Sequence, residues 1–203
     1  MEISELKEKL KREMTIDGVI NKRYYHSLEV CKMALKLEEH YHFGVSKEKL
    51  AIAGILHDCA KLKSNDVLWK YLERTETKEI IEELKQFPQI WHSFVGKTVA
   101  KEDYHINDDD ILSAIYYHTV GRPNMTKLEQ IIFVSDYIEE TRVGECFDKA
   151  RKACFEDLDK GTLLILAQSV DYLEKNGKII YSKTIDTYNY YLGKVKNNDW
   201  RNT

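Results

Sequence analysis

Proline and glycine are scarce in this sequence of 203 residues, which contains only two prolines and nine glycines. Because these residues interrupt regular elements and dominate tight turns, their scarcity argues against a turn-rich all-β fold and favours long helices. Hydrophobic residues make up 43% of the chain, which is enough for a packed core and excludes wholesale disorder. We therefore expect an all-α protein.

Paired cysteines and long apolar runs are also missing. None of the four cysteines belongs to a CxxC pair, which excludes zinc-ribbon and thioredoxin-like motifs. The first segment, MEISELKEKLKREM, is charged and amphipathic and lacks the apolar stretch of a signal peptide or membrane span. Scattered cysteines without a secretory signal are typical of a reducing compartment. We expect a cytoplasmic protein that makes no membrane contact.

The net charge is small, at −3, and no basic tail or stripe is present. A nucleic-acid partner is therefore not expected. A phosphate-containing substrate remains compatible with this charge, because a few local cations can dominate the potential of a cleft.

Hydrophobic periodicity, caps and breakers predict a series of helices and no strand. The helices are expected at residues 3–14, 22–42, 47–62, 65–71, 79–87, 90–102, 108–118, 126–140, 148–176 and 184–194. The third of these, KEKLAIAGILHDCAKL, is apolar on nearly all sides in its middle and should be central. We expect one domain over residues 1–203, with a core at about 20–145 and a C-terminal helical extension at about 146–203.

His57 and Asp58 lie on this central apolar helix. Burial of an ionisable pair is costly unless a partner compensates, so the pair is either a buried hydrogen-bonded His–Asp or part of a metal site. Two residues on other helices favour the metal: His26, in RYYH, and Asp136, which interrupts the apolar run IIFVSDYI. Imidazole and carboxylate together suit divalent iron, manganese or zinc. The pattern resembles the H…HD…D motif of the HD superfamily.

Two further histidines, His92 in IWHSFVG and His118 in ILSAIYYH, occupy positions where apolar residues would be expected. With them, five helices offer six ligands, a number that suits two metal ions bridged by Asp58. The alternatives are a surface or capping role for His92 and a helix-dipole interaction for His118. Surface positions are expected for the histidines beside polar or loop residues: His40, His42 and His105.

Longer motifs resemble YqeK-like HD proteins. The matching segments are RYYH (23–26), HDCAK (57–61), WHSFVG (91–96), HTVGRPNM (118–125), SDYIE (135–139) and, in the tail, TYNYYL (187–192). The combination of GRPNM with HD is far more specific than HD alone. The resemblance spans residues 22–142 and reaches the tail. One departure is visible, because SDYIEETR lacks the proline that usually follows ADYIE in the family, which leaves the position of Arg142 open.

The resemblance implies an HD-domain helical bundle with additional C-terminal helices. Proteins of this family are di-iron hydrolases that cleave diadenosine tetraphosphate symmetrically into two ADP molecules. It therefore implies two divalent metal ions, iron or alternatively manganese, and a dinucleoside polyphosphate or ADP-like nucleotide as partner. The implied metal ligands are His26, His57, Asp58, His92, His118 and Asp136.

On this basis we expect a hydroxide, formed from a water that the two metals share, to attack an inner phosphorus of the tetraphosphate. Asp58 and Lys61 are the catalytic candidates. Lys61 is expected to bind phosphate oxygens, although it could instead serve as a helix-end cation, and Arg122 could instead be solvated in its turn. The nucleotide-binding candidates are Arg23, Lys61, Thr119, Arg122, Tyr137 and Arg142.

Three alternatives to this function stay open. The chain could be an HD phosphohydrolase of another nucleotide, such as a mononucleotide or an alarmone. It could be a di-iron HD oxygenase, or a nucleotide-binding module without turnover. The amphipathic N-terminal helix and the tyrosines of the tail are compatible with a homodimer, although ordinary packing accounts for both.

Overall fold

The computed structural model describes residues 2–201, with side chains described for residues 2–197. Over this range the chain is predominantly helical, which confirms the predicted all-α class. The elements are α1 (Ile3–Glu13), β1 (Thr15–Ile16), β2 (Val19–Ile20), α2 (Lys22–Tyr41), α3 (Lys47–Leu56), α4 (Asn65–Thr75), α5 (Lys78–Leu84), the 3-10 turn η1 (Pro88–Ile90), α6 (Trp91–Glu102), α7 (Asp109–Tyr117), α8 (Lys127–Ile138), α9 (Glu145–Glu156), α10 (Leu158–Lys175) and α11 (Ser182–Arg201).

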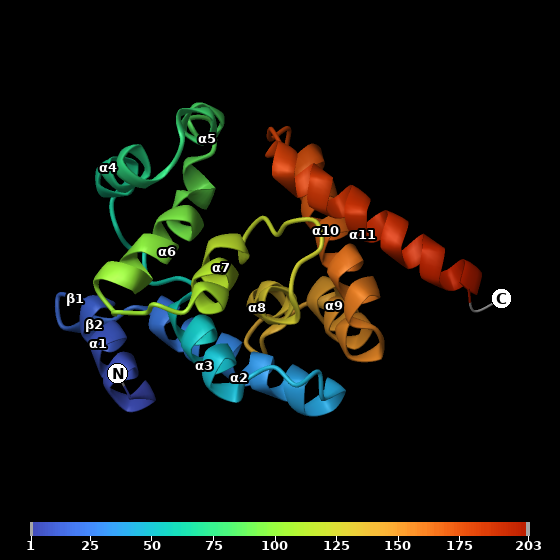
Figure 1. Cartoon of the computed structure of the whole chain (residues 1–203), viewed down its shortest axis with the longest axis horizontal. Helices are drawn as coiled ribbons and strands as arrows, with labels where there is room; N and C mark the ends of the chain where they lie inside the picture. Colours follow the sequence, from blue (N-terminus) through green and yellow to red (C-terminus); the bar gives the residue numbers. More distant parts are fainter. Residues whose placement is uncertain (1, 202–203) are drawn as a thin grey trace.

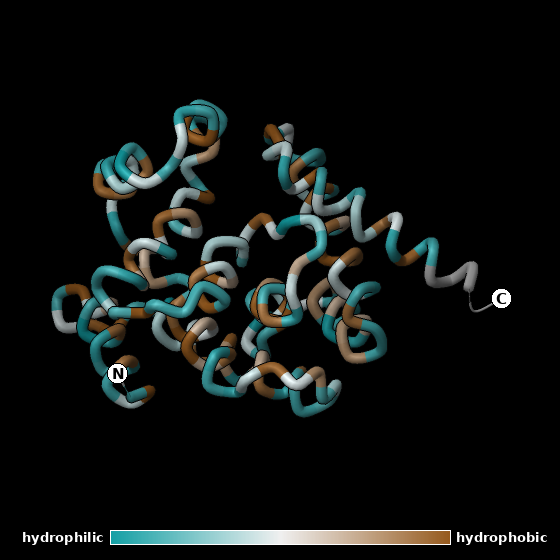
Figure 2. The backbone as a smooth tube through the Cα atoms, viewed as in Figure 1, coloured by the Kyte–Doolittle hydropathy of each residue, from teal (hydrophilic) through white to brown (hydrophobic). Residues whose placement is uncertain are grey.

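The helices form a central bundle with two outlying groups (Figure 1). In the bundle, α2, α3, α7 and α8 pack on one another, and α6 packs on α7. The group α4–α5 projects on one side, and α9–α11 lie on the other, where α9 and α10 contact α8. Figure 2 shows hydrophobic stretches in the central helices α3 and α8. Among the described residues, no helix combines the length and apolarity needed to cross a bilayer.

Helix α3 is the centre of this bundle, as its apolar sequence predicts. Every residue from Leu50 to Leu56 is buried. Gly54 allows the close approach of α2, because a Cβ atom there would lie only 2.8 Å from the Cα of Cys31. A larger residue at this position would push α2 away from α3, and with it the residues that both helices carry.

The α-helix of this segment ends at Leu56, earlier than the predicted residue 62. Beyond it, the amides of Cys59 and Lys61 bond to the carbonyls three residues earlier, of Leu56 and Asp58, at 2.9 Å each. These bonds are characteristic of turns tighter than an α-helix. His57 and Asp58 therefore sit at the end of α3 in a compact turn.

A short antiparallel hairpin, β1–β2, contradicts the expectation that no strand is present. Its two turn residues, Asp17 and Gly18, have φ angles of 50° and 77°. An Asp-Gly pair with positive φ at both positions is the favoured sequence for a two-residue hairpin turn. The Asp-Gly turn is visible in the sequence, but the flanking strands are only two residues long and show no alternating pattern that would predict a strand.

The predicted helix over residues 148–176 is also corrected, because the structure divides it at Asp157 into α9 and α10. Asp157 is extended, with φ −156° and ψ 116°, and its side chain accepts hydrogen bonds from the amides of Asp159 and Lys160. Such an N-cap stabilises a helix start without glycine or proline. Gly177, with φ 61°, follows the end of α10 as predicted.

Candidate metal centre

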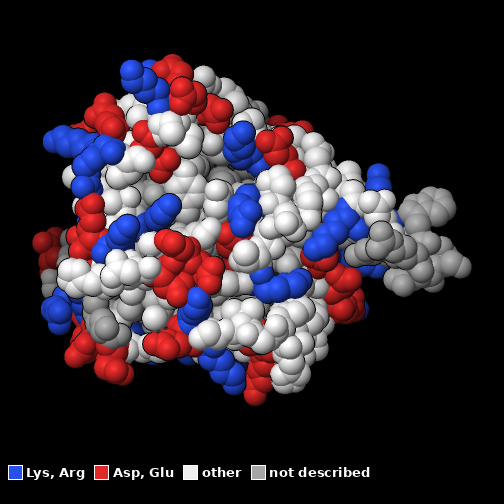
Figure 3. Space-filling view, in the orientation of Figure 1, with Lys and Arg blue, Asp and Glu red and all other residues white. Residues whose placement is uncertain are grey.

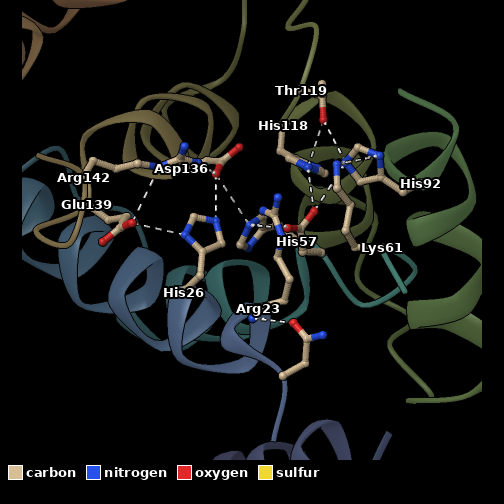
Figure 4. Close-up of polar contacts among 12 residues, drawn as sticks. Arg23, His26, His57, Lys61, His92, His118, Thr119, Asp136, Glu139 and Arg142 are labelled. Atoms are coloured by element: carbon tan, nitrogen blue, oxygen red, sulfur yellow. Dashed lines mark hydrogen bonds and ion pairs between the residues drawn. The ribbon is translucent and has the colours of Figure 1, made fainter. Parts of the chain in front are cut away.

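The six residues that the sequence marks as ligands come from five different helical segments and meet in one place (Figure 4). His26 lies on α2, His92 on α6 and Asp136 on α8. His57 and Asp58 follow the last residue of α3, and His118 follows the last residue of α7. The set consists of His26, His57, Asp58, His92, His118 and Asp136.

Two of these histidines are oriented by the helix ends that carry them. The Nδ1 of His57 lies 2.7 Å from the carbonyl oxygen of Gly54, and the Nδ1 of His118 lies 2.7 Å from that of Ile115. Because a carbonyl only accepts, each Nδ1 carries the proton and each Nε2 keeps its lone pair. Both Nε2 atoms therefore face the interior as potential ligands.

Asp58 is the central residue of the cluster. One carboxylate oxygen, Oδ1, lies 3.3 Å from the Nε2 of His92 and 3.6 Å from the Nε2 of His118. The other, Oδ2, lies 3.7 Å from the Nε2 of His57 and accepts a hydrogen bond from the guanidinium of Arg23 at 3.0 Å. One oxygen of this carboxylate thus faces His92 and His118, and the other faces His57.

Asp136 lies at the other end of the cluster. Its Oδ1 is 2.9 Å from the Nε2 of His26 and 3.9 Å from the Nε2 of His57. The same oxygen is 3.3 Å from the guanidinium of Arg142. Arg142, whose position the missing proline left open, therefore lies beside the candidate ligands.

The cluster has the composition and geometry of a metal site. Two sets of three ligand atoms lie within 4.8 Å of one another, namely His26–His57–Asp136 and His57–Asp58–His118. His57 belongs to both sets, and its buried Nε2 finds no hydrogen-bond partner in the part of the chain that the structure describes. An orphaned imidazole nitrogen in the interior costs free energy, and a divalent ion is a partner that would remove this cost.

The electrostatics of the cluster favour neutral imidazoles at His57 and His92 and an ionised carboxylate at Asp58. Burial lowers the pKa of His57 to about 4 and that of His92 to about 3. Burial by itself would raise the pKa of Asp58, but the neighbouring histidines outweigh it and hold this pKa well below the usual value. For His26, burial lowers the pKa, whereas the larger combined effect of Asp136 and other nearby carboxylates raises it. Among these three histidines, His26 is therefore the one at which protons compete most with a metal.

Lys61 and Thr119 lie on the side of His92 and His118. The Nζ of Lys61 is 3.1 Å from the Nε2 of His92. The hydroxyl of Thr119 lies 2.9 Å from the Nε2 of His118 and 3.3 Å from that of His92. Burial lowers the pKa of Lys61, with Asp58 opposing this shift. An amino group and a hydroxyl thus lie next to the candidate ligand nitrogens of His92 and His118.

Arg122 does not join the cluster. Its guanidinium binds the buried carboxylate of Glu129 at 2.9–3.1 Å and packs over the ring of Tyr117. Glu129 is the third residue of α8 and forms a capping box with Thr126, so it is fixed where it captures the arginine. The structure brings Arg23, Lys61, Thr119 and Arg142 into contact with the six residues but leaves Arg122 outside.

Glu139 is a residue of the site to which the sequence analysis gave no role. Only 1% of its surface is exposed, and its carboxylate lies 3.2 Å from the Nδ1 of His26. Its position at the C-terminal end of α8 could have marked it in the sequence, because a carboxylate there interacts unfavourably with the helix dipole. Such a residue persists in the interior only where other groups compensate its charge.

A cavity of about 850 Å³ opens beside the cluster, between the bundle and the C-terminal helices. Thr119, Tyr137 and Arg142 line it where it approaches the candidate ligands. Much of the remaining lining is aromatic or aliphatic, including Phe87, Phe147, Tyr172, Ile179 and Tyr181. The space-filling view shows a hollow of mainly uncharged surface with Lys and Arg side chains at its edge (Figure 3).

Comparison with known proteins agrees with this arrangement. Residues 23–141 match the family model described as HD domain. The chain belongs to the HD-domain family. This HD-domain protein is 34% identical over 170 residues to the symmetrical bis(5′-nucleosyl)-tetraphosphatase of Bacillus subtilis (strain 168), with 84% of this chain and 89% of that protein covered. It is 38% identical over 187 residues to the protein of the same name from Staphylococcus aureus (strain NCTC 8325 / PS 47), with 91% and 93% covered.

A solved structure extends the similarity to the whole fold. The crystal structure of a "predicted HD superfamily hydrolase involved in NAD metabolism" from Clostridium acetobutylicum has a TM-score of 0.85 and 32% sequence identity to this HD-domain protein. The match covers 96% of this chain and 98% of that one. The predicted HD fold with additional C-terminal helices is therefore confirmed, as is the resemblance to the tetraphosphatase group of HD proteins.

Proposed function

We propose that this HD-domain protein is a metal-dependent hydrolase that cleaves diadenosine tetraphosphate symmetrically into two molecules of ADP. The observation that carries the proposal is the convergence of six imidazole and carboxylate side chains, from five helical segments, around Asp58. Two relatives that match most of the chain are named for this activity, which directs the choice of substrate.

We assign two divalent ions, iron or alternatively manganese, to this centre. His26, His57 and Asp136 would hold one ion, and His92 and His118 the other, and Asp58, which lies between the two groups, would contribute to both. When bound, such a pair of ions activates a water and stabilises the charge on the attacking and leaving oxygens of a phosphoryl displacement. Burial disfavours protonation of His57 and His92, which leaves these two imidazoles available as ligands.

The chain's own cations would hold the phosphates. Arg23, Lys61 and Arg142 all contact members of the cluster, so their charges lie where phosphate oxygens would reach the centre. A fixed cation stabilises the negative charge that moves onto the leaving phosphate. Arg122 is held by Glu129, and for this reason we do not include it among the phosphate-binding residues.

The cavity offers a reason for symmetric cleavage. Its largely apolar and aromatic lining suits a nucleobase and ribose, whereas Thr119 and Arg142 mark the end nearest the cluster. If one ADP unit occupies this cavity, its second phosphate is the one that reaches the centre. The P–O bond in the bridge between the two inner phosphates is then cleaved. Water adds to the phosphorus of the bound ADP unit, and the second ADP leaves. Tyr137 would form part of the pocket wall.

The products test this proposal directly. Purified protein supplied with Fe²⁺ or Mn²⁺ and diadenosine tetraphosphate is expected to release ADP alone, as measured by anion-exchange chromatography. Release of AMP together with ATP would contradict symmetric cleavage. Equal or faster turnover of mononucleotides or alarmones would support a phosphohydrolase of another nucleotide. Activity with Mn²⁺ in the absence of oxygen argues against an oxygenase, and tight ADP binding without turnover would favour a binding module.

Replacing Lys61 with alanine is expected to lower kcat/KM by about 10²–10³-fold, the usual cost of removing one fixed charge-stabilising group from a reaction centre. The metal content should stay the same, because Lys61 offers no ligand at neutral pH. Steady-state kinetics and metal analysis measure the two effects. Lys63→Ala is the matched control, since Lys63 lies in the same segment but its Nζ is directed to Asp103, 3.9 Å away. An unchanged kcat/KM in Lys61→Ala would remove this residue from the mechanism.

A further inference from the structure

Glu139 is held by more partners than its place at a helix end requires. Its carboxylate accepts hydrogen bonds from the backbone amide and the hydroxyl of Thr141, both at 2.7 Å. The Nε of Arg142 lies 3.6 Å from it. A buried carboxylate loses much of its hydration free energy and needs such compensation. These contacts fix Glu139 in one position, from which it can orient a neighbour.

That neighbour is His26, whose ring lies between two carboxylates (Figure 4). Its Nδ1 is 3.2 Å from Glu139, and its Nε2 is 2.9 Å from Asp136. A histidine that binds a metal must keep one nitrogen unprotonated, and the hydrogen bond of the other nitrogen decides which one this is. With Glu139 accepting from Nδ1, the nitrogen that remains for a metal is Nε2, on the side of the ring where Asp136 lies.

The Nδ1 of His26 needs a side-chain acceptor because of the place of His26 in the fold. His57 and His118 follow the ends of their helices, and their Nδ1 atoms donate to the backbone carbonyls of Gly54 and Ile115. His26 lies inside α2, where the nearby carbonyls accept hydrogen bonds from amides of the helix itself. An acceptor for its Nδ1 must therefore come from another element, and α8 provides it through Glu139.

We propose that Glu139 is a positioning residue of the metal centre, which holds His26 with Nδ1 protonated and Nε2 directed at the metal shared with His57 and Asp136. Carboxylates that accept from the second nitrogen of a ligand histidine fix its ring and strengthen it as a ligand. Arg142 supports the arrangement, since its guanidinium lies near both Glu139 and Asp136. The inference rests on the proposed function in one respect, namely that the centre binds metal.

Titration with Mn²⁺ by isothermal calorimetry tests the role. Glu139→Ala is expected to weaken Mn²⁺ binding by about 10–100-fold, the usual effect of losing such a partner. Glu139→Gln keeps an oxygen that can accept from Nδ1 and should recover part of this loss. Glu38→Gln is the matched control, because Glu38 is also buried, lies near the other end of α2 from His26 and accepts hydrogen bonds from the amides of Gly44 and Val45. It should bind Mn²⁺ like the wild type.

A second measurement needs neither metal nor turnover. Nitrogen-15 NMR of the metal-free protein is expected to show a proton on the Nδ1 of His26 in the wild type, where Glu139 accepts from it, and to lose this Nδ1 proton in Glu139→Ala, where Asp136 beside Nε2 is the acceptor that remains. Circular dichroism verifies that the variants are folded. If the wild type binds Mn²⁺ and folded Glu139→Ala binds it equally tightly, the role of Glu139 is refuted while the proposed function stands. If the wild type binds no Mn²⁺, both are refuted.

Discussion

Replacing His57 with alanine is expected to remove bound metal and to lower the rate of hydrolysis by about a thousandfold or more, since a metal centre contributes several kcal/mol to transition-state stabilisation. His57 is the one residue shared by both sets of potential ligands. Its loss leaves Asp136 and Asp58 without the imidazole that lies near both of them. The effect should therefore extend to both ions.

Metal analysis and turnover of diadenosine tetraphosphate measure this effect, and circular dichroism establishes that the variant is helical. His40→Ala is the matched control, because the ring of His40 bonds to the carbonyl of Phe155 on the outside of the molecule. It should keep its metal and its activity. A His57→Ala protein with normal metal content and normal turnover would show that the cluster is a purely structural network.

Removing the metal from the wild-type protein with a chelator is expected to abolish hydrolysis and to lower the melting temperature. A ligand present at a hundred times its Kd stabilises a fold by about 2.7 kcal/mol, which for a protein of this size corresponds to a shift of roughly 5–10 °C. The physical reason is the buried Nε2 of His57, which has no hydrogen-bond partner among the described residues. Addition of Mn²⁺ or Fe²⁺ should restore both activity and melting temperature.

Thermal melts followed by circular dichroism, with and without chelator, measure this stabilisation. The His57→Ala protein provides an internal comparison, because its melting temperature should not respond to chelator or to added Mn²⁺. A wild-type melting temperature that is insensitive to both would contradict the assignment of this centre to metal ions.

The helices and most residues of the centre could be predicted from the sequence because burial marks them. His57, Asp58 and Asp136 each interrupt an apolar run, and such interruptions are rare without a function. The division of the predicted helix 148–176 could not be seen in this way. Asp157 starts a new helix through its own capping hydrogen bonds, and neither glycine nor proline announces the break.

The contacts of the charged residues around the centre were less predictable, because each charged side chain binds the partner that the folded chain places nearest to it. Arg122 follows His118 closely in the sequence and was a candidate for nucleotide binding. In the structure its guanidinium binds Glu129, which the capping box of α8 holds in place. The role of Glu139 depends on the packing of α8 against α2, which carries His26. Glu139 and His26 are 113 positions apart in the chain. No local pattern encodes such a pairing.

The cavity beside the centre has walls of two origins. The candidate ligands lie within residues 23–141, the part that matches the HD-domain family. Phe147 and Tyr172 belong to α9 and α10, and Ile179 and Tyr181 to the connection between α10 and α11. With this cavity as the proposed nucleotide site, chemistry and choice of nucleotide would be encoded in separate stretches of the gene. Mutations after residue 141 would then change which base is accepted while the reacting groups stay intact, and this segment would be where new substrate preferences evolve.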